Sequence, residues 1–444
     1  MSYGGDVSVI PGPPARGDGG LHDIASAGGL HAYQLRLHAE YGPVVRFELP
    51  GAASAVSVAD PVLLEATAGI NKRPEELFEF LAPLCEAGNL QTLPADEHTP
   101  WRRAVLSVLA GRRSHEAHFA GLAALAGDLA DRWAERAGAG PVELQKDLSA
   151  LSLRMICQYA LGNGVDDPEE VVTAFEVVLT EYLGRLYQPA DPGTEEQGRK
   201  RAQEALTYLR AVVNGVLASA RPDGNDLVAA LAAAGMSPAR IRDTVLMIML
   251  AAHHTTGVAV SWTLHLLSRH PAEAARVTAE IDQVLADRVM PEYADLKRLP
   301  RLQMALKESM RLYPPGPYGA RETTEDLVLA GYEIPAGTTI FYPFWAVHMN
   351  PQYWPDPKAF IPGRFAPEEA ARRPRYSYIP FGLGPRSCEG ASLAMVEAEL
   401  VLAILLRRFR FQPAAGHDVV PVERFVLWAA DGIRMNLTPR SAPR

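Results

Sequence analysis

The sequence predicts a mainly helical protein with a smaller β-rich part, and two observations carry this prediction. Residues 60–311 are rich in alanine and leucine, with charges alternating around apolar positions as on amphipathic helices packed in layers. After Arg311, proline and glycine become frequent, and short strand-like runs such as residues 338–341 appear.

Bulk properties narrow the class of protein. The chain has 444 residues, a formal net charge of -9 and three cysteines. The acidic balance argues against a general nucleic-acid binder, because a surface that follows phosphates needs an excess of basic residues. Cys85, Cys157 and Cys388 are far apart and odd in number, so a reducing compartment is expected rather than a disulfide framework. No signal peptide or membrane anchor is recognisable, so the protein is expected to be soluble and cytoplasmic.

The first elements are delimited by glycine and proline. Residues 1–20 are rich in both and are expected to form a flexible arm, with residues 21–444 as a single domain. Turn residues then bound a predicted helix over residues 30–41 and a predicted hairpin of strands 44–48 and 55–58.

One predicted helix is long enough to cross the whole core. Ser237 is a suitable N-cap, Pro238 fits the first helical position, and nothing stops the helix before Pro271. At about 1.5 Å per residue this helix is roughly 50 Å long. It is apolar on most sides over residues 245–262 and is therefore expected in the core. Two further elements are predicted near the C-terminus: a helix over residues 391–408 and a hairpin near residues 425–437.

The strongest motif is Phe381-Gly382-Leu383-Gly384-Pro385-Arg386-Ser387-Cys388-Glu389-Gly390. It resembles the haem-binding loop of the cytochrome P-450 family, Phe-x-x-Gly-x-Arg-x-Cys-x-Gly, in its soluble bacterial-type branch. The resemblance implies the triangular helical prism with a β-rich lobe, a haem b cofactor (iron protoporphyrin IX), and Cys388 as the metal ligand. The alternative is a buried structural cysteine in a glycine-rich turn.

Most residue types in this loop can be explained by what haem binding requires, and Glu389 is the exception. Phe381, Gly382 and Gly390 are expected to contact the haem, the glycines because they let the backbone pass close to the flat macrocycle. A helix begins just after Cys388, so its positive N-terminal end is expected to hold the thiol pKa down. Glu389 stands where the family usually has an aliphatic residue, and the sequence gives no reason for it.

By the same resemblance, basic residues bind the haem propionates. His98 and Arg102 match a His-x-x-x-Arg pair on one helix face, and Arg321 and Arg386 complete the set. The alternative for His98, Arg102 and Arg321 is an ordinary surface charge.

The middle of the long helix carries Ala251-Ala252-His253-His254-Thr255-Thr256, which resembles the family's oxygen-activation motif. Thr255 matches the threonine that handles dioxygen and relays protons, and Ala251 is expected beside the haem. His254 replaces the usual acid, and it is expected to relay protons because histidine titrates near neutrality. The alternatives are a packed core histidine at His254 and an intrahelical hydroxyl bond at Thr255.

A third resemblance is structural. Glu308 and Arg311 match the family's Glu-x-x-Arg pair, which shares one helix face and can form an ion pair. Arg364 lies in a segment resembling Phe-x-Pro-Glu-Arg-Phe, with Gly363 in place of the glutamate. The resemblance implies that this trio stabilises the core beneath the haem.

The substrate pocket is assigned by family analogy alone. Its expected wall is mainly apolar and comprises Phe78, Leu81, Tyr182, Leu246, Leu250, Ala251, Tyr318, Val426, Leu427 and Trp428.

The resemblance implies a monooxygenase that hydroxylates or epoxidises a hydrophobic molecule such as a steroid, terpenoid or polyketide. A ferredoxin and its reductase are expected to supply two electrons over Cys388. Two alternatives stay open: a peroxygenase or isomerase that needs no added electrons, and a haem-binding sensor without turnover. Thr255 and Thr256 argue against the first, because such relatives usually lose the threonine.

Overall fold

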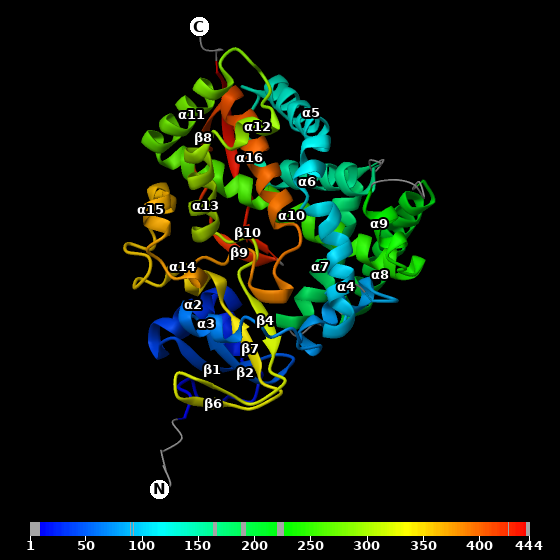
Figure 1. Cartoon of the computed structure of the whole chain (residues 1–444), viewed down its shortest axis with the longest axis vertical. Coiled ribbons are helices and arrows are strands. Elements are labelled where there is room, and N and C mark those ends of the chain that lie inside the picture. Colours follow the sequence, from blue (N-terminus) through cyan, green and yellow to red (C-terminus); the bar gives the residue numbers. More distant parts are fainter. Residues whose placement is uncertain are drawn as a thin grey trace.

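The computed structural model describes residues 9–88, 90–91, 93–162, 167–187, 192–219, 226–424 and 426–440. Over these residues the protein is mainly helical with small sheets, as predicted (Figure 1). The α-helices are α1 (Leu21–Ala27), α2 (Leu30–Tyr41), α3 (Pro61–Thr67), α4 (Ala95–Leu109), α5 (Arg112–Arg136), α6 (Leu144–Leu161), α7 (Pro168–Tyr187), α8 (Pro192–Ser219), α9 (Leu227–Ala233), α10 (Pro238–Arg269), α11 (Pro271–Leu285), α12 (Tyr293–Leu296), α13 (Pro300–Leu312), α14 (Phe344–Met349), α15 (Pro367–Ala370) and α16 (Ala391–Arg408).

The strands form small sheets at separate places in the chain. The largest has the order β1-β2-β7-β4, and the others are β3-β11-β8, β10-β9 and β5-β6. The strands are β1 (Val44–Leu49), β2 (Ala52–Val58), β3 (Val142–Glu143), β4 (Gly319–Glu322), β5 (Leu327–Leu329), β6 (Tyr332–Ile334), β7 (Thr339–Tyr342), β8 (Phe409–Pro413), β9 (Pro421–Arg424), β10 (Val426–Ala429) and β11 (Arg434–Pro439). Short 3₁₀ helices cover Glu76–Leu84, Pro362–Phe365, Arg375–Ser377 and Gly384–Arg386.

The four-stranded sheet supplies one wall of the site described below. β1 and β2 form the predicted hairpin, β2 runs parallel to β7, and β7 pairs antiparallel with β4. In Figure 1 this sheet lies at the lower end of the molecule with α2 and α3, apart from the main helical body. The register sets Arg321 of β4 opposite Ile340 of β7, and both are buried.

Helix α10 runs through the core, as its length and apolar sequence predicted. The Ser237 hydroxyl oxygen accepts a hydrogen bond from the Arg240 backbone N–H at 3.3 Å, and Pro238 begins the helix. By length and composition α10 could cross a membrane, but 78% of its most apolar 18-residue window is buried inside the protein. It packs on α6, α13 and α16, so it is the central helix of this fold.

The described end of the N-terminal segment contacts β1, since the Arg46 N–H donates to the Pro11 carbonyl at 2.8 Å and the Arg16 N–H donates to Glu48 at 2.8 Å. The flexible arm over residues 1–20 stays a prediction. The hairpin expected near residues 425–437 is wrong. β10 pairs with β9, from which a single residue separates it, whereas β11 pairs with β8 and β3.

Candidate active site

The segment that carries Cys388 is a tight loop placed directly before α16. The Cys388 N–H donates to the Phe381 carbonyl at 2.9 Å, which closes the loop on itself. Gly384 has a φ of +66°, and a Cβ there would lie 1.8 Å from the Ala68 carbonyl oxygen, so only glycine fits. The loop is therefore held against the segment after α3, and its end presents Cys388.

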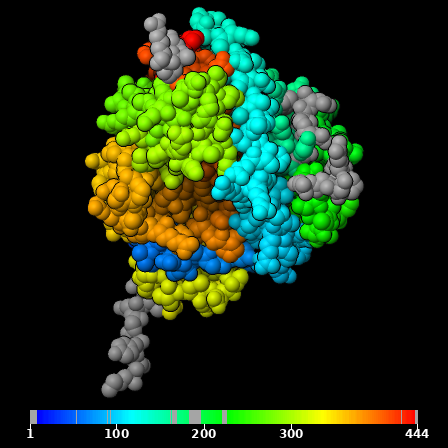
Figure 2. Space-filling model, turned by 45° about the horizontal axis from the view of Figure 1, so that its top comes forward, coloured from blue at the N-terminus to red at the C-terminus, as the bar shows by residue number. Residues whose placement is uncertain are grey.

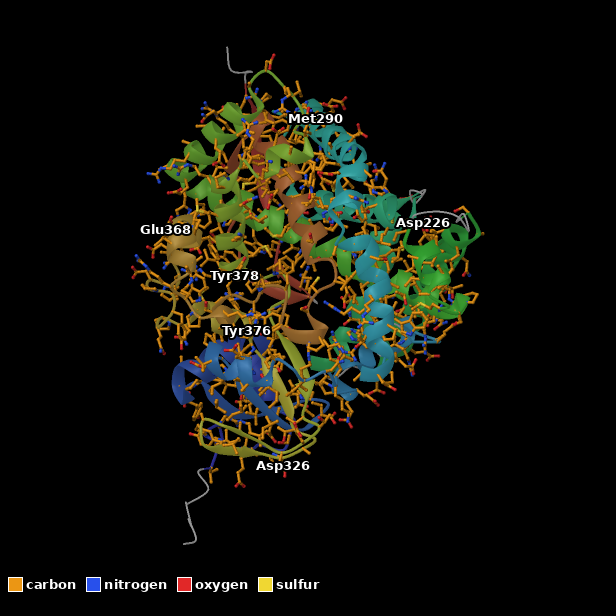
Figure 3. All side chains as sticks on the ribbon, viewed as in Figure 1. Asp226, Met290, Asp326, Glu368, Tyr376 and Tyr378 are labelled. Atoms are coloured by element: carbon orange, nitrogen blue, oxygen red, sulfur yellow. The ribbon has the colours of Figure 1, made fainter. Side chains whose placement is uncertain are left out.

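Tyr378 fixes the entry to this loop. Its side chain is labelled in Figure 3, where it lies near the middle of the molecule. Its hydroxyl donates to the Lys307 carbonyl at 3.1 Å, and its ring packs edge-on against Phe365. The segment before the loop is thereby bound to α13, the helix that carries Glu308 and Arg311.

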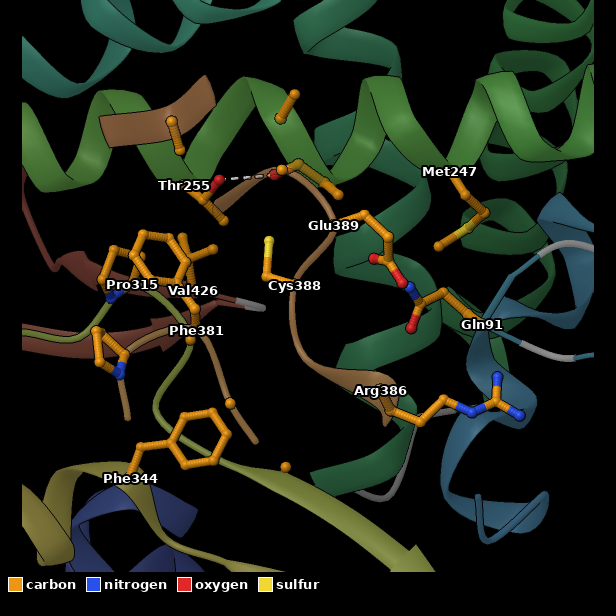
Figure 4. Close-up of a pocket in the computed structure, with 18 of the residues that line it drawn as sticks. Gln91, Met247, Thr255, Pro315, Phe344, Phe381, Arg386, Cys388, Glu389 and Val426 are labelled. Carbon is orange, nitrogen blue, oxygen red and sulfur yellow. Dashed lines mark hydrogen bonds between the residues drawn. The ribbon is translucent and has the colours of Figure 1, made fainter. Parts of the chain in front are cut away.

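Cys388 counts as exposed although it lies deep in the molecule, because its side chain faces an internal cavity. In Figure 4 the sulfur points from the loop toward α10. Burial raises the pKa of the thiol to about 11 and the Glu389 charge adds to the rise, while the backbone N–H groups of Gly390 and Ala391 lower it. The N–H groups at the N-terminal end of α16 thus lower the pKa as expected, but burial outweighs them. A bound metal cation would remove the proton outright.

The cavity has a volume of about 430 Å³ and is lined mostly by apolar side chains. Five of the predicted pocket residues line it: Phe78, Leu81, Ala251, Tyr318 and Val426. Phe381, Gly382, Arg386 and Gly390, predicted as haem contacts, line it as well.

Four predicted pocket residues are absent from the lining. Leu246 and Leu250 are fully buried on another face of α10, because each lies one residue, or about 100°, away from the lining residues Met247 and Ala251. Leu427 follows Val426 in β10 and points to the opposite face. Trp428 also lies outside the lining and packs edge-on against His254, with ring centroids 5.1 Å apart. The Tyr182 side chain lies outside the described residues.

The motif on α10 places its residues on two sides of the helix. Thr255 lines the cavity, and its hydroxyl donates to the Ala251 carbonyl at 2.8 Å (Figure 4). His254 is only 4% exposed and lies off the cavity, with its ring centroid 3.5 Å from that of His253. Burial lowers its pKa well below the usual value, so the ring is neutral. This geometry favours the packed core histidine over the proton relay.

Buried cations gather at the edge of the cavity. Arg386 donates to the backbone carbonyls of Asn71, Leu90 and Leu93 and to the Asn71 side chain, and Arg321 donates to the Ala320 and Leu383 carbonyls. Burial lowers the pKa of both guanidinium groups to about 10. Within the described ranges, no carboxylate lies at salt-bridge distance from either side chain.

His98 and Arg102 lie behind this edge rather than on the cavity lining. Neither ring nitrogen of His98 has a hydrogen-bond partner among the described residues, and burial lowers its pKa to about 3. Arg102 donates to the Ser387 carbonyl at 2.7 Å and forms an ion pair with Glu389. The structure thus attaches Arg102 to the Cys388 loop, a contact that the sequence did not predict.

These features fit a haem. A cysteine faces a mostly apolar cavity between the loop and α10, and the cavity edge holds buried guanidinium groups whose only described hydrogen-bond partners are uncharged. Buried charge without a counter-charge is costly, and two propionate carboxylates would remove that cost. Arg321 and Arg386 are best placed for this contact, with the unsatisfied His98 ring nearby.

Glu308, Arg311 and Arg364 come together as the resemblance implied. The fully buried Arg311 and Glu308 form two hydrogen bonds of 2.8 Å, and Arg364 Nε lies 3.3 Å from Glu308. Arg311 also donates to the carbonyls of His348, Pro357 and Ala359. Every charge in this cluster has a partner within the chain, which is typical of a structural role.

Sequence reasoning missed two ionisable residues on the cavity lining. Arg73 is enclosed beside the ring of Phe78, 4.5 Å from its centroid, and burial lowers its pKa well below the usual value. Glu397 of α16 is 2% exposed, and burial raises its pKa to about 8 while a hydrogen bond to Thr256 opposes the rise. Two acids, Glu397 and Glu399, stand within the otherwise apolar stretch of α16, and they were the available signal for Glu397.

Comparison with known proteins identifies relatives along almost the whole chain. The family described as Cytochrome P450 matches residues 11–437. Human cytochrome P450 4F8 is 42% identical over 194 residues, which are 43% of this chain and 37% of that protein. In Streptomyces melanosporofaciens, cyclooctatin synthase is 32% identical over 316 residues (68% of each chain). Cyclooctat-9-en-7-ol 5-monooxygenase of the same organism is 31% identical over 291 residues (62% of this chain and 63% of that protein). The chain thus spans little more than a third of the human relative.

Proposed function

This chain belongs to the cytochrome P450 family, and on that premise we propose that it is a haem-thiolate monooxygenase acting on a hydrophobic small molecule. One observation carries the proposal: the Cys388 side chain faces an apolar cavity whose opposite wall is the threonine-bearing part of α10. A haem held through Cys388, with its propionates at Arg321 and Arg386, would supply the activation of dioxygen for insertion of one oxygen atom into the substrate.

The chain's own residues control water and protons in the cavity. The Thr255 hydroxyl donates to Ala251, so its oxygen keeps lone pairs that accept hydrogen bonds from water or substrate. Glu397, with a pKa near 8, holds a proton at neutral pH and contacts Thr256 beside Thr255. The remaining lining is mostly apolar and keeps water sparse. We therefore assign the proton supply to Glu397 of α16, which contacts α10 at Thr256, rather than to His254.

The substrate we propose is a terpenoid-like hydrocarbon skeleton. The described lining offers aromatic and aliphatic surface from Phe78, Leu81, Met247 and Val426, while its buried arginines Arg321 and Arg386 lie at the edge proposed for the haem propionates. The name of one Streptomyces relative specifies a cyclic alkenol, cyclooctat-9-en-7-ol, as its substrate. A steroid or polyketide of similar size would meet the same apolar wall.

We propose that two electrons come from a ferredoxin and its reductase, docking near the Cys388 loop of a soluble, cytoplasmic protein. In Figure 2, orange atoms, in the colour range around residues 350–400, are set back in a hollow between cyan and yellow-green segments. The Cys388 loop belongs to this range of residues, and a recessed surface over the loop would suit a small protein donor, because a short path would favour electron transfer to a haem held there.

The test is the carbon monoxide spectrum of the reduced protein. The parent is expected to show the long-wavelength band of thiolate ligation, and Cys388→His is expected to move it to the imidazole position and abolish oxygenation. Cys157→Ala, which removes a buried cysteine away from the cavity, is expected to keep the band. An unchanged band in Cys388→His would refute the assignment.

NADPH oxidation separates the remaining functions. With ferredoxin and reductase added, a monooxygenase consumes NADPH faster when a bound hydrophobic compound shifts the haem spectrum, and it releases oxygenated product. A sensor shows no substrate-dependent consumption. A peroxygenase forms product from peroxide alone and gains nothing from the redox partners.

A further inference from the structure

Glu389 is the residue that directly follows Cys388, where related sequences usually carry an aliphatic side chain. It lines the cavity, and in Figure 4 its carboxylate points toward Gln91, away from Thr255. A carboxylate next to a metal ligand has no packing role that an aliphatic residue would not serve better. Its charge therefore requires an explanation.

The contacts of Glu389 lead back to α4. Its carboxylate accepts a hydrogen bond from Arg102 Nη1 and lies 3.9 Å from His98 Nε2. The same Arg102 donates through Nη1 to the Ser387 carbonyl at 2.7 Å and through Nη2 to the Ser387 hydroxyl at 3.2 Å. One guanidinium thus binds both residues that flank Cys388, and Glu389 supplies the charged half of that attachment.

The charge balance around the loop makes this pair distinctive. Arg73, Arg321 and Arg386 surround the cavity edge without a carboxylate at salt-bridge distance among the described residues. On the described cavity lining, the carboxyl groups belong to Glu389 and Glu397, and the pKa of Glu397 near 8 leaves it protonated at neutral pH. Glu389 is thus the negative charge that the chain itself places beside the haem site.

We propose that Glu389 is a positioning residue that lowers the reduction potential of the haem iron, with Arg102 offsetting part of its charge. The inference rests on the proposed function. Reduction adds one electron from the external donor to the ferric iron, and no bond forms or breaks. A nearby negative charge stabilises the ferric form over the ferrous form, and a nearby positive charge does the opposite.

Potentiometric titration of the holoprotein tests this. Glu389→Gln, which keeps the shape and removes the charge, is expected to shift the midpoint potential to more positive values, and Glu389→Leu is expected to do the same. Glu389→Asp, which keeps the charge, is expected to stay near the parent. Arg102→Gln leaves the carboxylate uncompensated and is expected to shift the potential to more negative values.

The opposite directions of the potential shifts expected for Glu389→Gln and Arg102→Gln distinguish an electrostatic effect from damage to the loop. If the pair only holds the loop in place, Glu389→Gln and Arg102→Gln disturb the same contact and shift the potential in the same direction, which would overturn the proposal. An unshifted Glu389→Gln would also overturn it. If Glu389→Gln retains too little haem, the midpoint potential of Glu389→Leu is compared with that of Glu389→Asp, and the sign of that difference tests the proposal. The carbon monoxide band of the parent reports separately on thiolate ligation, so failure of the proposed function is distinguishable from failure of this inference.

Discussion

Arg311 beside Glu308 and the arginines Arg321 and Arg386 at the cavity edge are all buried, and they differ in how their positive charge is compensated. The Arg311 guanidinium donates to the Glu308 carboxylate and to backbone carbonyls, and Glu308 also accepts from the Ile361 N–H. At the cavity edge, Arg321 and Arg386 meet only uncharged partners among the described residues. A cluster compensated from within contributes to the fold, whereas a cluster left in charge excess is a binding site for an anionic ligand.

Removing a partner from the compensated cluster should have the largest effect. Glu308→Ala leaves Arg311 buried without its carboxylate, which costs about 3–5 kcal/mol. We expect insoluble or haem-free protein, measured by soluble yield and haem content. The matched control is Glu369→Ala, which breaks an exposed pair with Arg372 and should change stability by about 0–1 kcal/mol. Normal holoprotein from Glu308→Ala would contradict the comparison.

Glu397 avoids an uncompensated buried charge in another way, because its carboxyl group keeps its proton and stays neutral. Its folded pKa of about 8 lies above the ordinary value of 4.5. Between these pH values the unfolded carboxyl ionises while the folded one remains protonated. Stability should therefore fall with rising pH by up to about 1.4 kcal/mol per unit.

Glu397→Gln should remove that slope, because glutamine stays neutral in both states. Denaturant unfolding from pH 5 to pH 8 measures the free energy of unfolding of both proteins. The variant should become increasingly more stable than the parent as the pH rises. Parallel pH profiles would show that Glu397 is ionised in the folded protein.

Arg321→Gln tests the uncompensated cluster. The loss of charge-assisted hydrogen bonds to an anionic ligand costs about 1.5–3 kcal/mol, or roughly 10- to 100-fold in haem affinity. We expect faster haem transfer to a scavenging acceptor protein with little change in the unfolding midpoint. Arg364→Gln, from the compensated cluster, should lower the unfolding midpoint with little change in the rate of haem transfer. If both variants lose haem and stability equally, the two clusters do not differ in role.

Local signals explain what the sequence predicted well. The bounds of α2 and α10 and the start of α16 follow from flanking glycine and proline residues and from the Ser237 cap, which act over a few residues. β10 pairs with its sequence neighbour β9, whereas β11 pairs with β8 and with β3, which is almost 300 residues earlier in the chain. That distant partner gives no local signal, so β10 and β11 were paired wrongly. Motif spacing located Cys388 and Glu308.

Burial explains what the sequence could not predict. Arg73 and Glu397 carry no motif, and their importance comes from enclosure by segments distant in sequence. The periodicity of a helix shows which residues share a face, but it does not show which face points toward the site. For that reason Leu246 and Leu250 were assigned to the cavity that Met247 and Ala251 line.

The smallest effect is expected at His254, which holds an unsatisfied polar atom but no charge. Its Nδ1 has no hydrogen-bond partner among the described residues, and its lowered pKa leaves the ring neutral between His253 and Trp428. A neutral ring off the cavity lining has no route for handing a proton to bound oxygen. His254→Phe, which fills the same space, should keep turnover and the ratio of product to NADPH consumed.

Thr255→Ala is the matched variant one residue away on the cavity side. It removes the hydroxyl that faces the cavity, so NADPH should still be consumed while peroxide replaces product. If His254→Phe instead slows turnover and raises the solvent isotope effect at unchanged substrate binding, then proton relay through His254 is real. General acid–base relay is worth roughly 10²–10⁴ in rate where it limits turnover, so this pair of variants separates an unsatisfied core histidine from a proton carrier.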